Sequence, residues 1–114
     1  MTVLRPETRF LAPLTRQFAP FGLVGREVAV SLRPDGIGLT GAQSGAVVLA
    51  FAAIGRLRFG FDEPRRLVPM LRLWRTGERR PLVFVGDGDR AGFAAFARAT
   101  AAQLLRDRPA TVLE

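Results

Sequence analysis

DRAGFAAFARATAAQLLRDR, residues 89–108, sets the architecture that the rest of this chain must fit. One set of its side chains recurs at i, i+3, i+4, i+7 and i+11, which is the spacing of one stripe of an α-helix. The stripe consists of Phe93, Phe96, Ala97, Thr100 and Leu104. The opposite side carries Ala95, Arg98, Ala99, Ala102 and Arg106. No other window keeps this period over such a length, so the sequence predicts one amphipathic helix over residues 89–108, with the stripe packed on a sheet.

The clearest strand pattern lies between Glu27 and Gly41. Residues 27–33 alternate between apolar and polar side chains, as a strand with one buried face does. The next three residues, Pro34-Asp35-Gly36, have the chemistry of a tight turn, and we expect Gly36 to adopt a positive φ. The apolar alternation resumes after the turn and continues to Gly41. The pattern therefore predicts a β-hairpin over residues 27–41.

Further strands follow in short bursts. The uncharged run Ala46–Phe51 predicts a central strand, and the small residues after it permit a bend. The remaining strands are predicted over residues 56–61, 67–75 and 81–86, with a turn at Gly77 between the last two. Pro109 ends the helix, and we expect a loose tail after it. One amphipathic helix behind a set of strands predicts a mainly β (α+β) fold.

Residues 1–26 are interrupted by Pro6, Pro13 and Pro20, which break helices and strand ladders. Between these prolines lie apolar side chains that need a surface to cover. We therefore expect an N-terminal arm packing on the domain, and both a short strand and a single helical turn within it stay open. The length of 114 residues favours a single domain, predicted over residues 27–114.

This order of elements resembles the pleckstrin-homology-like (PH-like) superfold. The hairpin Glu27–Gly41, the segment Val47–Phe61 and the helix 89–108 carry the likeness, which covers residues 27–108. The resemblance implies a two-sheet antiparallel split barrel of six to seven strands capped by one C-terminal α-helix. The first hairpin loop is short and acidic here, whereas phosphoinositide-binding members carry basic residues there. The helix also lacks the Trp of many members, since Trp74 lies in a predicted strand, so lipid binding is not carried over.

The composition argues against most catalytic chemistry. The chain has no Cys and no His, which removes thiolate nucleophiles, disulfides and the commonest general base and metal ligand. Residues 36–41 match G-x-G-x-x-G, but their alternation continues a strand, whereas a dinucleotide site needs a helix to begin there. Asp87 and Asp89 are better placed to cap the helix than to bind a metal ion. We therefore expect no enzyme, no cofactor, no metal and no small-molecule substrate.

All 17 basic residues are Arg, and Lys, Asn and Tyr are absent. These absent residues have AT-rich codons, so a GC-rich bacterial genome explains the preference more simply than phosphate recognition does. No targeting segment or membrane span is visible, and the sequence predicts a soluble cytoplasmic protein, with peripheral attachment to a membrane left open.

The net charge of +7 is unevenly distributed along the chain. Residues 56–80 hold eight Arg against three acidic residues, a net charge of +5. Strand parity predicts that Arg56, Arg58 and Arg72 share one solvent-facing side of neighbouring strands. The candidate surface for an anion or a partner is Arg56, Arg58, Arg72, Trp74, Arg75, Arg79 and Arg80. An Arg-aromatic surface of this kind can meet phosphates, and the plain alternative is a solvated sheet face.

These observations support two functions. The first is a non-catalytic interaction or scaffolding module that acts through contacts with another protein or with itself, the homo-oligomer forming through residues 1–24. The alternative is binding of an anionic membrane surface or a nucleic acid through the Arg-rich face of residues 56–80. Steep salt dependence would accompany the second, because each neutralised phosphate releases counterions.

Overall fold

The computed structural model describes residues 9–13, 21–23, 27–41, 45–61, 68–86, 90–107 and 111–114. In chain order, the elements of this part are β1 (Arg9–Pro13), β2 (Glu27–Arg33), β3 (Gly36–Gly41), β4 (Ala46–Ala50), the 3-10 helix η3 (Phe51–Ala53), β5 (Ile54–Phe61), β6 (Pro69–Arg75), β7 (Leu82–Val85), α1 (Arg90–Asp107) and β8 (Val112–Leu113). The predicted mainly β fold with one C-terminal helix is confirmed.

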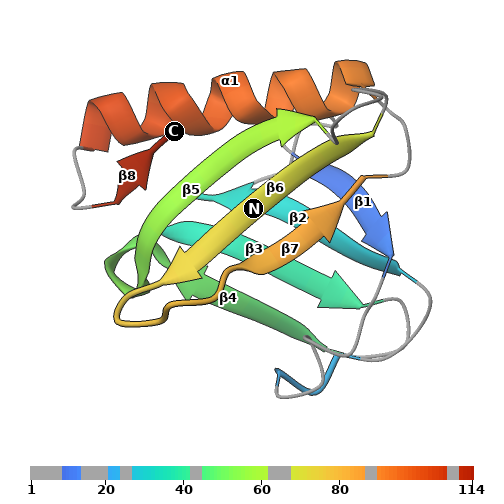
Figure 1. Cartoon of the computed structure of the whole chain (residues 1–114), viewed down its shortest axis with the longest axis horizontal. Coiled ribbons are helices and arrows are strands. Elements are labelled where there is room, and N and C mark those ends of the chain that lie inside the picture. The colour runs from blue at the N-terminus through green and yellow to red at the C-terminus, as the bar shows by residue number, and fades with distance from the viewer. Residues whose placement is uncertain are drawn as a thin grey trace.

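The strands form two four-stranded sheets (Figure 1). The first has the order β1-β2-β3-β4, and its neighbouring strands are all antiparallel. The second has the order β7-β6-β5-β8, in which β8 alone runs parallel to its neighbour. The chain passes from one sheet to the other through η3, at the bend that the small residues after Phe51 predict. The described strands therefore form two separate layers and no closed barrel.

The β2–β3 hairpin is confirmed, but the predicted role of Gly36 is wrong. Positive φ angles occur at Gly22 and Gly77 among the described glycines, while Gly36 is the first residue of β3. A Cβ atom on Gly36 would lie 2.8 Å from the Cα of Ala50 and closer still to the Leu49 carbonyl oxygen. Glycine is needed there because the β4 backbone approaches closely, and not because the turn requires a left-handed residue.

The prediction of a central strand at Ala46–Phe51 is also wrong. Strand β4 ends at Ala50 and lies at the edge of the first sheet, paired with β3 alone among the described strands. Phe51 is buried, but it belongs to η3. Uncharged runs suit central strands because both of their faces are covered; β4 instead exposes three of its five side chains.

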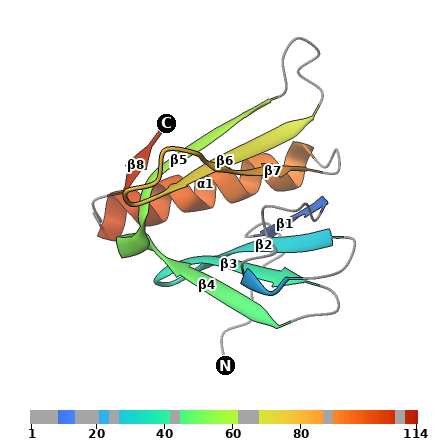
Figure 2. The ribbon, with the colours of Figure 1, turned by 60° about the horizontal axis from the view of Figure 1, so that its bottom comes forward.

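The long helix α1 runs along one side of the two sheets, beside β5 (Figure 1), at a level between them (Figure 2), so its apolar stripe covers the open side of their shared core. Phe93, Phe96, Thr100 and Leu104 of the predicted stripe are buried. The Phe59 ring of β5 packs against both aromatic residues of the stripe, with ring centroids 5.6 Å from Phe93 and 5.9 Å from Phe96. This cluster joins the helix to the inner face of the second sheet.

One buried residue of α1 was not predicted. The Gln103 side chain is buried, and its Nε2 donates hydrogen bonds to the carbonyl oxygens of Arg33 (2.7 Å) and Pro34 (2.9 Å). The nearby Asp35 carbonyl accepts a further bond from the Phe51 amide, at 2.9 Å. The helix and η3 therefore both hold the β2–β3 turn.

The expectation of a loose C-terminal tail is wrong. Strand β8 pairs with β5, and the Glu114 backbone extends the pairing at both its N–H and its C=O, with bonds to Leu57 and Phe59. The Thr111 hydroxyl lies within hydrogen-bonding distance of the Phe51 and Ile54 carbonyl oxygens, at 3.0 and 2.9 Å. Residues 111–114 are therefore held against the domain, because they supply the fourth strand of the second sheet.

Of residues 1–26, the structure describes 9–13 and 21–23. Strand β1 pairs with β2 over its whole length, so the alternative of a strand within the arm holds for this segment. Buried Ala12 and Leu23 belong to the same core as the two sheets. The predicted self-association through residues 1–24 rests mostly on residues outside the described ones.

Candidate interaction surface

The outer face of the second sheet carries the residues that strand parity predicted to lie together. In the β5–β6 ladder Arg56 faces Trp74 and Arg58 faces Arg72. Paired residues of an antiparallel ladder point to the same side of the sheet. The intervening residues Leu57, Leu71 and Leu73 are fully buried on the other side. The prediction that Arg56, Arg58 and Arg72 share a solvent-facing side is therefore confirmed.

Arg56 is the most constrained residue of this face. Its guanidinium carbon lies 3.9 Å from the centroid of the Trp74 ring, a cation–π geometry. Its Nη1 forms an ion pair with Glu114 Oε1 at 3.2 Å, so the C-terminal residue neutralises part of the surface. The Nε atom is buried and has no hydrogen-bond partner among the described residues. Arg56 thus holds Trp74 and the tail together.

Arg58 and Arg72 are the available cations of this face. Arg58 is exposed and Arg72 is half-buried. Within the described part of the chain neither forms an ion pair. Because the two residues face each other across the ladder, their guanidinium groups present adjacent positive charges to a partner.

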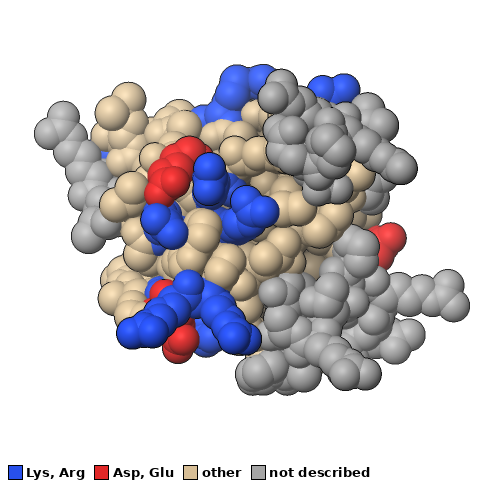
Figure 3. All heavy atoms as spheres, in the orientation of Figure 1, with Lys and Arg blue, Asp and Glu red and all other residues tan. Residues whose placement is uncertain are grey.

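The other three predicted Arg residues do not join this group. Arg75 lies at the end of β6, with its guanidinium carbon 5.2 Å from the centroid of the Phe21 ring. Arg79 and Arg80 are exposed in the connection between β6 and β7, after the predicted turn at Gly77. Figure 3 shows one group of basic side chains over the middle of the second sheet and another at the level of the β6–β7 turn, besides those along the top at the level of α1. The sequence predicted one surface where the structure has two.

Apolar side chains that were not singled out from the sequence extend the face toward its β7 edge. The register places Val83 beside Arg72, and Val85 beside Met70. Val85 is exposed, while Met70 and Val83 are half-buried. The same period-two parity that located the Arg residues would have found these. The outer face therefore combines an Arg–Trp stack, two Arg residues that form no ion pair with the described residues, and an aliphatic strip.

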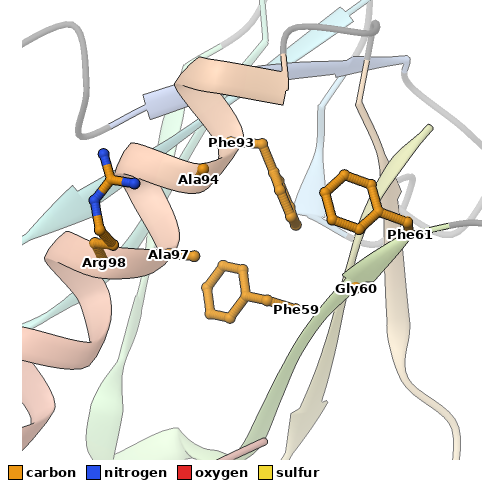
Figure 4. A pocket seen from close by; sticks show the side chains of 7 residues that line it. All are labelled: Phe59, Gly60, Phe61, Phe93, Ala94, Ala97 and Arg98. Carbon is orange, nitrogen blue, oxygen red and sulfur yellow. The ribbon is translucent and has the colours of Figure 1, made fainter. Parts of the chain in front are cut away.

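A separate apolar pocket of about 250 Å³ opens between the end of β5 and α1 (Figure 4). Its lining is Phe59, Gly60, Phe61, Phe93, Ala94, Ala97 and Arg98. Ala97 belongs to the predicted buried stripe, yet it is only half-buried, because it lines this opening. The Phe61 ring, 38% exposed, lies edge-on to Phe93. The volume is smaller than that of most small-molecule sites and suits a single apolar side chain.

The remaining sequence candidates have structural roles or lie elsewhere. The G-x-G-x-x-G residues Gly36–Gly41 form β3, in which the strand continues as the alternation predicts. Asp87 and Asp89 lie outside the described residues, so their predicted helix capping stays a prediction. Within the described ranges no group of three or more His, Cys, Asp or Glu side chains could hold a metal ion.

A scan against models of known protein families finds no match to this sequence, and a search of curated proteins finds none either. In the part of the chain that the structure describes, no helix has both the length and the hydropathy to cross a membrane. The function therefore has to be argued from the surfaces themselves.

Proposed function

We propose that this protein is a non-catalytic interaction module that binds an acidic protein surface through the outer face of its second sheet. The observation that carries the proposal is the Arg56–Trp74 stack, flanked by Arg58 and Arg72. Trp and Arg are the residue types most enriched among the energetically dominant contacts of protein interfaces. The half-exposed Trp74 ring already contacts the Arg56 guanidinium, so little of its side-chain entropy is lost on binding.

The outer face combines charged and apolar side chains, which favours a protein as its partner over a uniform polyanion. Glu114 already neutralises part of Arg56, and Met70 and Val85 add apolar area at the other end. Protein interfaces combine apolar contact area with polar and charged residues, and this face contains both. The guanidinium groups of Arg58 and Arg72 give the partner an acidic signature and speed its association.

The test compares two double variants of equal charge. Arg58→Glu with Arg72→Glu alters the face, whereas Arg79→Glu with Arg80→Glu makes the same change in the β6–β7 turn. Immobilised full-length chains are exposed to an extract of the source cells, and we expect a protein that wild type and the turn variant retain but the face variant loses. The interaction is then quantified with the purified partner from the emission of Trp74, the single Trp of the chain. If no protein separates the two variants, the proposal is wrong.

The second candidate is binding of an anionic membrane surface or a nucleic acid by the same face. The excess of basic residues over residues 56–80 favours it, since such a charge attracts polyanions at low salt. Wild type and both variants are applied to heparin and to vesicles with and without acidic lipid. Salt-sensitive retention that is lost only in the face variant would support this candidate. Equal retention of the two variants would show attraction by net charge alone.

The fold assignment is part of the proposal. We infer that the two sheets and α1 form a split barrel of the PH-like type. Two features of the described elements support it: the strands change sheets at η3, and the long helix α1 follows the last strand of the second antiparallel set. An experimental structure that superposes poorly on PH-like domains would overturn it. As a PH-like domain, this protein would bind its partner through the outer face of the second sheet. The first hairpin loop, which has the acidic Asp35, would not take part.

A further inference from the structure

Among the described strands, β4 pairs with β3 alone and leaves its outer edge open. Its sequence, Ala46-Val47-Val48-Leu49-Ala50, has no charged residue and no Pro, and its register with β3 is regular. Val48 at the middle of the strand is 42% exposed. Soluble proteins usually protect a sheet edge with charges, prolines or bulges, because unpaired N–H and C=O groups accept strands from other molecules. An apolar edge without these features is a pairing surface.

The backbone geometry identifies the groups that are available. Phe51, directly after β4, donates its N–H across to the Asp35 carbonyl on the β3 side. In an antiparallel ladder successive residues direct their N–H and C=O groups to opposite sides. The peptide groups of Val47 and Leu49 therefore point toward β3, and those of Ala46, Val48 and Ala50 point away from the sheet. Among the described residues, these three have no partner strand on that side.

We propose that β4 pairs antiparallel with β4 of a second copy of this chain, about a two-fold axis through Val48. The sequence of the strand is nearly the same in both directions, so a copy rotated about its centre presents the same order of side-chain sizes. In this register Val48 faces its equivalent, and Ala46 faces Ala50. A two-fold interface requires a patch that is complementary to itself, and β4 has this property.

The register also satisfies the hydrogen bonds. Its hydrogen-bonded pairs are Ala46 with Ala50 and Val48 with its equivalent, and these are the residues whose peptide groups point outward. Facing residues of a hydrogen-bonded antiparallel pair exchange two bonds, so every outward group between Ala46 and Ala50 gains a partner. The core-side residues Val47 and Leu49 face each other across the axis, which would continue the apolar layer between the two copies.

Charge favours this edge over the other surfaces. Two copies with a net charge of +7 each repel one another, and the repulsion is smallest where the local charge is lowest. Residues 27–55, which contain β4, hold Arg33 against Glu27 and Asp35, a net charge of −1. The Arg-rich face belongs to the other sheet.

The contact is short, which sets its strength. A five-residue edge buries less surface than the roughly 1,200–2,000 Å² of specific stable interfaces. We therefore expect a weak dimer that forms at high micromolar concentration and dissociates on dilution. The two copies would share one continuous sheet, with β1 at each outer end.

The experiment is sedimentation of the full chain over a concentration series, with substitutions at Val48. Val48→Pro removes an outward N–H and blocks pairing, while the bonds to β3 are kept, because the N–H of this residue does not point to β3. Val48→Thr retains the N–H and the branched shape, and serves as the matched control. Val48→Lys is the second blocking variant, since it places two like charges opposite each other at the axis. Circular dichroism and Trp74 emission verify the fold of each variant.

We expect wild type and Val48→Thr to dimerise with similar dissociation constants, and both blocking variants to raise the constant at least tenfold. A wild type that stays monomeric at millimolar concentration overturns the proposal. A dimer that both folded blocking variants leave intact also overturns it, and would direct attention to residues 1–24. Arg58→Glu with Arg72→Glu should dimerise at least as well as wild type, so this inference and the proposed binding face can fail independently.

Discussion

Replacing Gln103 by Leu should destabilise the protein although it makes the helix stripe more apolar. The amide Nε2 carries two hydrogens and donates both to the turn between β2 and β3, to the carbonyls of Arg33 and Pro34. Leu has a similar size and cannot donate. Both carbonyl oxygens would then lose a partner at a site where the Gln103 side chain is buried.

The magnitude follows from two opposing contributions. Each hydrogen bond contributes a net ~1 kcal/mol, and buried acceptors left without a partner add to the loss, so the substitution should cost about 2–3 kcal/mol. Greater apolar burial by Leu offsets roughly 1 kcal/mol of this. The net loss of unfolding free energy is therefore about 1–2 kcal/mol, which for a chain of this length lowers Tm by about 4–8 °C.

Gln103→Glu sharpens the test through pH. The new carboxylate would face two carbonyl oxygens without a donor, so burial and repulsion raise its pKa in the folded state above the ordinary ~4.3. A group whose folded pKa is raised favours folding when protonated, and this contribution is lost as pH rises above the unfolded pKa. The Glu variant should therefore approach the Leu variant in stability near pH 4 and fall below it at pH 7.

Urea unfolding followed by Trp74 emission measures these differences, and Ala102→Leu on the exposed side of α1 is the control. Hydrogen exchange at the Phe51 amide gives a local reading, because its acceptor Asp35 lies in the same turn. A Leu variant within about 0.5 kcal/mol of wild type, with unchanged Phe51 protection, would refute the reasoning. It would mean that the turn holds its conformation without the helix.

Three further outcomes are expected. Phe96→Asp should prevent folding, because the loss of a fully buried ring costs ~3–5 kcal/mol and an unpaired carboxylate adds to it; a variant melting within a few degrees of wild type would contradict this. Gly36→Val should destabilise far more than Gly38→Ala, because the first Cβ meets the β4 backbone and the second meets the movable Ser31 and Arg33 side chains; similar small losses of Tm in both would refute it. Thr111→Val should cost about 1 kcal/mol, the contribution of one hydroxyl donor, and should speed hydrogen exchange at the Phe59 amide, which binds the tail; unchanged exchange would show that Thr111 does not anchor β8.

The sequence predicted the elements whose signals are local. The helix over 89–108 and the hairpin over 27–41 were found within about one residue of their observed ends, since side-chain period and turn residues act over a few positions. The alternation of side chains along β5 and β6 is an equally local signal, and it correctly predicted that Arg56, Arg58 and Arg72 share one face of the sheet.

Features that depend on distant segments were missed. Gly36 was assigned to turn chemistry, whereas the reason for glycine is the β4 backbone beside it. Gln103 is an unexplained polar residue on an apolar stripe until the turn 70 positions earlier is placed against it. Strand order within a sheet leaves no periodic signal, so nothing in the uncharged run Ala46–Phe51 distinguished an edge from a centre.

The C-terminal tail illustrates how such a contact changes a functional argument. By composition, Glu114 is one acidic residue in a short segment after Pro109, yet β8 brings it onto Arg56. That ion pair lowers the positive charge of the candidate face and fixes the guanidinium over Trp74. A charge count over residues 56–80 therefore overstates the positive charge that a polyanion would encounter.

The two proposed contacts lie on different sheets, and this separation has a mechanical consequence. The Arg–Trp face covers the outside of the second sheet, whereas β4 is the edge of the first, and α1 runs along the side where β5 lies (Figure 1). Pairing of two β4 edges would leave both Arg–Trp faces uncovered, so a dimer would present two copies of the same weak surface. Linked sites bind a repeated partner at a high effective concentration, and affinity rises without any new contact. A weak edge and a small face can therefore act together on a repetitive acidic partner, while each remains reversible by itself.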